Sequence, residues 1–249
     1  WSRVADVSFP KSSGAEPHSA TSRSARPSAG HAASRVRPVA RRSAMVDKPF
    51  DGAVYAIVSS GDSLFAASSQ GLLTSRTAGV SWSAIEGGGP EELYFLGSAR
   101  GEVVAAGLKA MRLSKDGGLS WKSTTSPSQL SQLTSVAVDG NGGLWAGGRE
   151  GVFYSPDDGA SWQTVPGLLV SDVSSVYYDA ASQRILITNG ASGTIVYALH
   201  LPEKKVTFWD TGWNLRFVRP VGDHLLGVTP YDGVVLEPRM VNSPVASHH

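Results

Sequence analysis

The sequence predicts an all-β fold, a β-propeller of four-stranded blades. A turn pattern, Ser-x-Asp-x-Gly-x-Ser-Trp, is written three times and ends at Trp82, Trp121 and Trp162, which are 39 and 41 residues apart. Four short β-prone runs fit into each interval of about 40 residues, which is typical of a propeller blade. A second pattern, an apolar pair followed by small or apolar residues, extends the count to five copies at intervals of 39, 41, 41 and 40; it starts at Leu64, Val103, Leu144, Ile185 and Leu225.

Composition agrees with this fold and excludes several functions. The chain has 249 residues, 28 of them glycine, and only 17% are charged, which suits many tight turns. The absence of cysteine excludes disulfides, thiolate catalysis and cysteine-based zinc sites. A net charge of +1 gives no indication of nucleic-acid binding, and no apolar run approaches the ~18 residues of a membrane span, so no transmembrane segment is expected.

The chain opens with a strand and a segment of different composition. Residues 1–7 look like a stray outer strand, since Trp1-Ser-Arg-Val resembles Trp162-Gln-Thr-Val after the third turn. Residues 8–49 are rich in Ser, Ala, Arg and Pro, with eight basic and two acidic residues, and are too poor in apolar side chains to offset the entropy of ordering. We expect a disordered basic linker; a basic arm for a membrane surface or an acidic partner and a targeting-like segment are the alternatives.

The blades are expected within residues 50–239, followed by a flexible tail at 240–249. In the first copy the expected strands are Ala53–Ser59, Leu64–Ser68, Leu72–Arg76 and Val80–Ile85. The fifth copy lacks a fourth strand. Either the strand at residues 1–7 completes it and removes two open sheet edges, or the five blades are part of a larger six- or seven-bladed ring.

Every residue type in the turn pattern is suited to closing a turn. Asp and Ser oxygens accept hydrogen bonds from nearby backbone N–H groups, Gly permits a positive φ, and Trp packs between neighbouring sheets. A carboxylate here could instead be catalytic or bind Ca²⁺, but the structural interpretation explains every position. The first copy has Thr77 in place of Asp. The structural set is Ser75, Gly79, Trp82, Ser114, Asp116, Gly118, Trp121, Ser155, Asp157, Gly159 and Trp162.

The turn pattern resembles the Asp-box, or BNR repeat, of sialidase-like propellers. The repeat style, as in Val103-Val-Ala-Ala followed by Ser114-Lys-Asp-Gly-Gly-Leu-Ser-Trp121, is more similar to photosystem II stability/assembly factor-like propellers. That resemblance implies a non-catalytic, extracytoplasmic scaffold (periplasmic, secreted or thylakoid-lumen-like) that binds a partner protein. The alternative it leaves is a glycoside hydrolase or carbohydrate-binding protein of the sialidase/xyloglucanase kind.

Propellers bind ligands at the end of the blades where second-to-third-strand loops and blade-to-blade connections meet. The candidate partner or ligand face here comprises Lys109, Arg149, Glu150, Asp172, Trp213, Tyr231 and Asp232. No catalytic set stands out. The nearest match to the sialidase Phe/Tyr-Arg-Ile-Pro motif, Phe217-Val-Arg219-Pro220, lies at the wrong end of the chain, and the six histidines lack metal-ligand spacing. We expect no metal and no cofactor.

Overall fold

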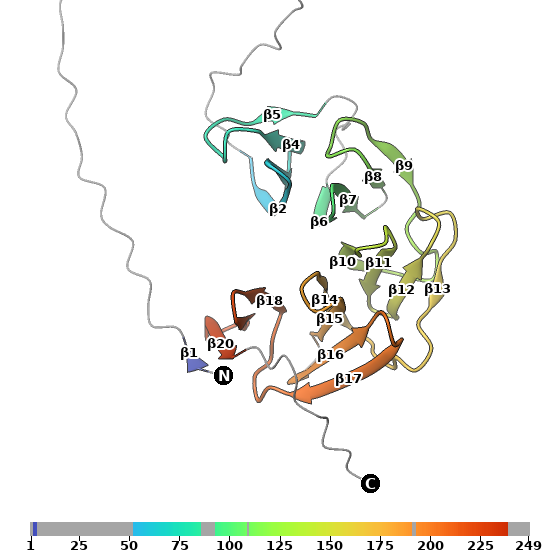
Figure 1. Cartoon of the computed structure of the whole chain (residues 1–249), viewed down its shortest axis with the longest axis vertical. Coiled ribbons are helices and arrows are strands. Elements are labelled where there is room, and N and C mark those ends of the chain that lie inside the picture. Colours follow the sequence, from blue (N-terminus) through green and yellow to red (C-terminus); the bar gives the residue numbers. More distant parts are fainter. Residues whose placement is uncertain (1, 4–51, 86–92, 109, 191–192, 239–249) are drawn as a thin grey trace, which may run out of the picture.

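The computed structural model describes residues 2–3, 52–85, 93–108, 110–190 and 193–238. These residues form β-strands and no helix, and the strands build five four-stranded antiparallel sheets. The sheets follow one another as the blades of a propeller (Figure 1), which confirms the predicted fold class. None of the described residues belongs to a helix of a kind that could cross a membrane. The segment 8–49 and the tail 240–249 lie outside the described residues.

Each of the first four blades takes its strands consecutively from the chain. The first blade consists of β2 (Val54–Ser60), β3 (Ser63–Ser68), β4 (Gly71–Ser75) and β5 (Ser83–Ala84), and the second of β6 (Leu93–Ala99), β7 (Glu102–Gly107), β8 (Met111–Ser114) and β9 (Lys122–Thr124). The third consists of β10 (Leu133–Val138), β11 (Leu144–Gly148), β12 (Gly151–Ser155) and β13 (Gln163–Thr164). The fourth consists of β14 (Val173–Asp179), β15 (Arg184–Asn189), β16 (Ile195–His200) and β17 (Lys205–Asp210).

The fifth blade combines the two ends of the described chain. Strands β18 (Phe217–Val221), β19 (His224–Val228) and β20 (Val234–Pro238) form its first three positions. Strand β1 (Ser2–Arg3) pairs antiparallel with β20 as the fourth, with Ser2 opposite Leu236 and Arg3 opposite Val235. The strand near residue 1 therefore occupies the place that the fifth copy leaves vacant.

The fourth strands are shorter than expected in the blades that carry the turn motif. A strand was predicted over Val80–Ile85, yet β5 covers only Ser83–Ala84. Residues 80–82 belong to the turn, whose hydrogen bonds to the side chain at position 77 take the place of ladder pairing. Of the two blades without a recognisable turn motif, the fourth has a six-residue fourth strand, β17, whereas the fourth strand of the fifth blade, β1, has two residues.

The core lies between blades rather than within one. The second and third blades share a cluster that joins Val104 and Ala106 to Val136 and Ala146. Similar clusters join the third blade to the fourth, the fourth to the fifth and the first to the second. Stacking apolar sheet faces in this way explains why four of the five strand-two patterns contain glycine or alanine, since these small residues allow neighbouring sheets to approach closely.

The five blades follow an arc with an open sector between the first blade and the fifth (Figure 1). Neighbouring blades contact each other through the inner strands β2, β6, β10, β14 and β18 in that order. Among the described residues, no contact of comparable extent joins β18 back to β2. One sheet face of the first blade and one of the fifth therefore look onto this sector.

Candidate functional site

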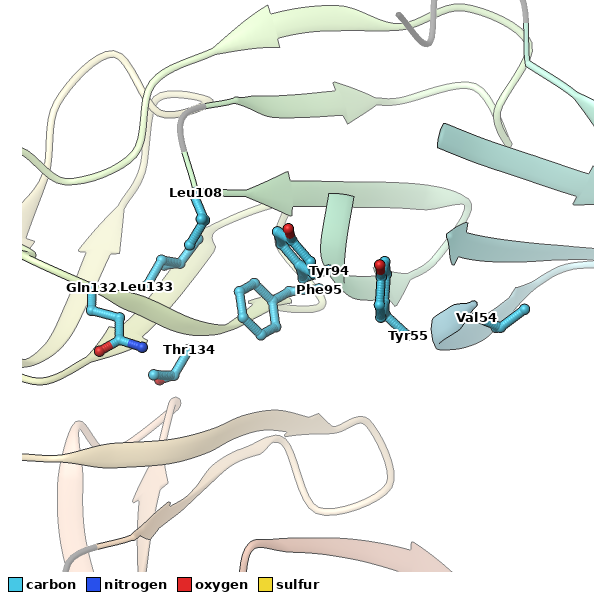
Figure 2. Close-up of a pocket in the computed structure, with 8 residues that line it drawn as sticks. All are labelled: Val54, Tyr55, Tyr94, Phe95, Leu108, Gln132, Leu133 and Thr134. Carbon is cyan, nitrogen blue, oxygen red and sulfur yellow. The ribbon is translucent and has the colours of Figure 1, made fainter. Parts of the chain in front are cut away.

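An open groove of about 570 Å³ lies where the inner strands of the first three blades begin. The strand order places this end of the blades together with the second-to-third-strand loops, so it is the end where propellers bind ligands. We call it the loop end. The groove is lined by Val54 and Tyr55 of β2, Tyr94 and Phe95 of β6, Leu108 after β7, and Gln132, Leu133 and Thr134 at the start of β10 (Figure 2).

Three aromatic rings form the middle of the groove, which we therefore call the aromatic groove. The ring centroids of Tyr55 and Tyr94 are 4.8 Å apart with the planes tilted by 50°, and those of Tyr94 and Phe95 are 6.1 Å apart at 52°. Tyr55 is 42% exposed and Leu108 is 66% exposed. Figure 2 shows the three aromatic side chains lying in sequence along the groove. Exposed aromatic and aliphatic side chains that gather in one place mark a binding surface.

Polar groups lie at one end of the aromatic groove. Thr134 is held by its own blade and the next, because its Oγ1 donates to the backbone carbonyls of Gly147 at 3.1 Å and Val173 at 2.5 Å. The carboxamide of Gln132 lies beside it (Figure 2) and offers both a donor and an acceptor. The groove thus combines an apolar floor with a few polar groups, which is the usual make-up of a ligand site.

The described residues that line the groove include no Asp, Glu, His, Lys or Arg. Acid–base hydrolysis of a glycosidic bond needs a pair of carboxyl groups about 5–10 Å apart. Within the described part of the chain, no cluster of three or more His, Cys, Asp or Glu side chains is arranged to hold a metal ion. The chemistry that this lining supports is contact and hydrogen bonding.

Three of the residues predicted for the partner face lie together at the loop end and are bound into the scaffold. The carboxylate of Glu150 accepts hydrogen bonds from the hydroxyl and, at 3.0 Å, the backbone N–H of Ser131, which hold the pKa of Glu150 below its usual value. The N–H of Asp172 donates to the carbonyl of Arg149 at 2.9 Å, and the Asp172 carbonyl accepts from Gly190. These contacts tie the loops of the third and fourth blades.

The other predicted face residues are separate from this group. Tyr231 is 95% exposed on the β19–β20 loop, and the N–H of the neighbouring Asp232 donates to Thr229 Oγ1 at 2.7 Å. Trp213 packs against the core cluster between the fourth and fifth blades. Lys109 lies outside the described residues. None of the predicted face residues that the structure describes lines the aromatic groove.

The residues of the turn motif are engaged in local hydrogen bonds. In the second blade, Ser114 Oγ donates to Asp116 Oδ1 at 2.8 Å and accepts from the N–H of Gly118. Asp116 also accepts from the N–H and hydroxyl of Ser120, and these bonds lower its pKa to about 2. The third blade repeats the arrangement around Asp157, whose pKa is also lowered.

In the first blade, Thr77 takes the place of the aspartate. Its Oγ1 accepts a hydrogen bond from the N–H of Ser81 at 2.9 Å, and Ser75 Oγ accepts one from the N–H of Gly79 at 2.9 Å. The turn therefore closes without a carboxylate. All three turns lie at the end of the blades opposite the aromatic groove, because they join the third strand to the fourth.

The turns of the second and third blades also bind each of these blades to the one before it. Trp162 Nε1 donates to the carbonyl of Thr125 at 2.9 Å, and Thr125 Oγ1 donates to the carbonyl of Gly159 at 2.6 Å. Trp121 meets Phe65 of the first blade edge-on, with centroids 6.0 Å apart. The positions at which the turn motif carries Asp, Gly and Trp are thus explained by blade assembly.

Arg219 is a partly buried cation between the fourth and fifth blades. Its guanidinium lies 4.3 Å from the ring centroid of Tyr177, and Nη1 donates to Ser175 Oγ at 3.1 Å and to the Val218 carbonyl at 2.9 Å. Burial lowers the pKa of Arg219 to about 10. Among the described residues no carboxylate forms an ion pair with it. Stacking and neutral acceptors therefore hold this side chain.

Sequence reasoning missed the aromatic groove because it searched the loops for polar residues. Apart from Leu108 and Gln132, the groove residues are the first residues of inner strands, which resemble ordinary core positions in the sequence. A usable signal was the run Leu93-Tyr94-Phe95, where the third blade has Leu133-Thr-Ser. Phe95 packs against the core cluster between the second and third blades, and Tyr94 beside it is only half-buried.

Comparison with family models and with curated protein sequences finds no match. Solved structures do match in fold. YCF48 bound to D1 peptide aligns with a TM-score of 0.52 at 15% identity, over 72% of this chain and 63% of that one. YCF48 from Cyanidioschyzon merolae aligns with a TM-score of 0.53 at 13% identity, over 77% and 73%.

A GH74 enzyme of Niastella koreensis is also similar, with a TM-score of 0.58 at 18% identity, over 75% of this chain and 29% of that one. At these identities the likeness shows the propeller fold alone. The chain spans less than two thirds of the length of the peptide-bound YCF48 chain and less than a third of the GH74 chain.

Proposed function

We propose that this chain is a non-catalytic propeller scaffold that binds an extended segment of a partner protein in the aromatic groove. The observation that carries the proposal is the row formed by Tyr55, Tyr94 and Phe95, flanked by the exposed Leu108. Aromatic side chains are the commonest anchors at protein interfaces because they bury a large apolar area with few rotamers. The polar groups of Gln132 and Thr134 would fix the register of a peptide backbone.

Two further observations support this function. The groove lies at the loop end, which is exposed and distant from the structural turns. A structure of the same fold, YCF48, is known with a D1 peptide bound, so a propeller of this kind can accept a peptide. By the resemblance of its repeats, we propose an assembly- or stability-factor-like role in an extracytoplasmic compartment.

Carbohydrate is the competing ligand, since sugar rings also stack on tyrosine and a GH74 enzyme shares the fold. Binding of a sugar by these rings would need no carboxylate, whereas hydrolysis would need two. The lining of the groove favours binding over turnover in either case. The two ligand classes are separated by direct measurement.

The test is an array of fluorescent 12-residue peptides, with xyloglucan oligosaccharides as the parallel probe, measured by fluorescence polarisation. We expect peptides with aromatic or aliphatic residues to bind in the micromolar range. Leu108→Asp and Tyr55→Ala should each weaken binding about tenfold, equivalent to about 1.4 kcal/mol. Tyr231→Ala is the matched control, because Tyr231 is 95% exposed at the same end of the blades but outside the groove.

Three results would contradict the proposal. Peptides that bind all variants equally would place the site elsewhere. Binding of the oligosaccharides alone would assign the groove to carbohydrate. Release of reducing sugar from xyloglucan by the wild-type chain would show an enzyme.

A further inference from the structure

Each blade has two sheet faces with different neighbours. The leading face packs on the preceding blade and the trailing face packs on the following one. At the junction of the second and third blades, Val104 and Ala106 belong to a trailing face, and Val136 and Ala146 belong to a leading face. The register of the strands gives every blade the same alternation, so equivalent positions can be compared along the chain.

On the leading face of the first blade, Ile57 is exposed where its equivalents in the third and fourth blades are buried, while Ala66 beside it is only 2% exposed. Ile57 pairs with Ala66 as Val136 pairs with Ala146 and Val176 with Ile187. Ile57 is 57% exposed, whereas Val136 is 3% exposed and Val176 is 1% exposed. The difference is the preceding blade, which the later blades have and the first lacks among the described residues.

Leu64, at the start of the second strand, follows the same rule. It is partly exposed, whereas its equivalents Val103, Leu144 and Ile185 are 0%, 1% and 0% exposed. These positions are filled by large apolar residues in every blade. Burial against a neighbouring sheet is what such residues favour.

The first turn shows the same incompleteness. Trp121 packs on the first blade, and Trp162 packs on the second and donates to its backbone. Trp82 is 36% exposed. Its Nε1 donates within its own turn to the carbonyl of Gly79 at 3.0 Å, as Trp121 Nε1 does to Gly118 at 3.3 Å, so its exposure and not this bond sets Trp82 apart. The first blade therefore carries the tryptophan that in later blades packs on the preceding blade, but among the described residues no preceding blade is there to receive it.

The trailing face of the fifth blade is the complementary surface. Leu226 is equivalent to Phe65, Val104, Trp145 and Leu186, which are 1%, 1%, 4% and 2% exposed because a following blade covers them. Leu226 itself is only partly buried. Beside it on the same face, Val228 is also partly exposed.

We propose that these two faces bind each other between copies of the chain, with the trailing face of the fifth blade of one copy on the leading face of the first blade of the next. A second copy is the occupant that the structure favours, because each chain carries both halves of a junction that it already forms four times internally. The contact would continue the same stacking of apolar sheets across the open sector.

The area sets the expected strength. Four strands about 4.8 Å apart, each about five residues of 3.3 Å, cover roughly 300 Å² on each side. Stable interfaces bury about 1,200–2,000 Å² in total, so this contact belongs to the weak class and depends on concentration. It is heterologous, and a heterologous contact that does not close into a ring adds copies in series.

The test is sedimentation velocity of the full chain from about 1 to 200 µM. We expect the mean mass to rise from the monomer value of 26.1 kDa to at least twice that value across this range. Ile57→Asp on the leading face and Leu226→Asp on the trailing face should each keep the chain monomeric. Leu169→Asp is the control, because Leu169 is 91% exposed in the connection between the third and fourth blades.

Mixing the two variants separates this contact from other modes of association. The Ile57→Asp chain keeps its trailing face and the Leu226→Asp chain keeps its leading face, so an equal mixture should form a 1:1 dimer and grow no further. Circular dichroism establishes whether each variant is folded. If an aspartate variant does not fold, the serine variant at the same position, Ile57→Ser or Leu226→Ser, takes its place.

The proposal is overturned if the wild-type chain stays monomeric throughout. It is also overturned if either face variant associates like wild type, or if the mixture stays monomeric while the wild type associates. An isologous contact between two leading faces would leave Leu226→Asp fully associating, which the heterologous contact forbids.

Discussion

Gly117 and Gly118, neighbours in the second turn, allow one inter-blade contact to be measured in isolation. Both have positive φ, +70° and +83°. A Cβ at Gly117 would have no atom within 4 Å, whereas a Cβ at Gly118 would lie 2.3 Å from Cε1 and Cζ of Phe65 in the first blade. Alanine at either position bears the cost of left-handed backbone, and only at Gly118 does it also collide with the neighbouring blade.

The magnitudes follow from these two terms. Left-handed backbone costs an L-residue about 1–2 kcal/mol. Overpacking a well-packed site costs about 1–3 kcal/mol more. We therefore expect Gly118→Ala to lower the free energy of unfolding by about 2 kcal/mol more than Gly117→Ala. For a chain of this size that difference corresponds to a Tm lower by roughly 4–8 °C.

Urea unfolding followed by tryptophan fluorescence measures both variants. The decisive comparison repeats them in a Phe65→Leu background, where the shorter side chain withdraws from the turn and the difference between the two alanines should shrink. Equal destabilisation by Gly117→Ala and Gly118→Ala, within about 0.5 kcal/mol, would refute the claim that the turn packs on the first blade.

Three further predictions concern charge and packing. Hydrogen bonds from Ser120 and Ser114 lower the pKa of Asp116 to about 2. Its carboxylate therefore stabilises the fold fully above pH 4, and this stabilisation is lost as the pH falls toward 2. Asp116→Asn should make the fall in Tm between pH 4 and pH 2 less steep. Trp162→Ala should cost about 2–3 kcal/mol in urea unfolding and Trp82→Ala below about 1, because only the first packs on another blade. Arg219→Lys should lower the free energy of unfolding by about 1 kcal/mol, because ammonium loses the planar stacking.

Each of these predictions has a contrary result. An unchanged pH profile in Asp116→Asn would mean that the turn carboxylate does not contribute to acid stability. Equal losses from the two tryptophan variants would mean that Trp82 is buried by another part of the chain. A lysine at position 219 as stable as the arginine would show that stacking contributes little there.

The architecture was predictable because repetition averages out local ambiguity. A single run such as Leu144–Gly147 could belong to many folds, but five copies in one register leave few. The boundaries of the fourth strands were not predictable in the same way. In the first blade, hydrogen bonds between Thr77 and Ser81 form in place of strand pairing. The period of the repeat does not show which of the two sets of hydrogen bonds will form.

The candidate site was harder to predict than the fold. Alternation marks Tyr55 and Tyr94 as strand residues and says nothing about whether a blade end is covered. Exposure at those positions depends on how three blades splay around a common axis, which is a property of the assembly. The polar loop residues Arg149, Glu150 and Asp172 are prominent in the sequence, yet their hydrogen bonds brace the loops against one another.

The pairing of β1 with β20 has a consequence for the order of folding. The first four sheets form from hairpins whose partners lie close in sequence, whereas Ser2 must find Leu236 across most of the chain. Closing so long a loop is entropically costly and slow, and the pairing that it forms involves a strand of only two residues. The fifth sheet should therefore be completed last and open first, and the amide hydrogens of β20 that point toward β1 should exchange with deuterium well before those of the central β11 and β15.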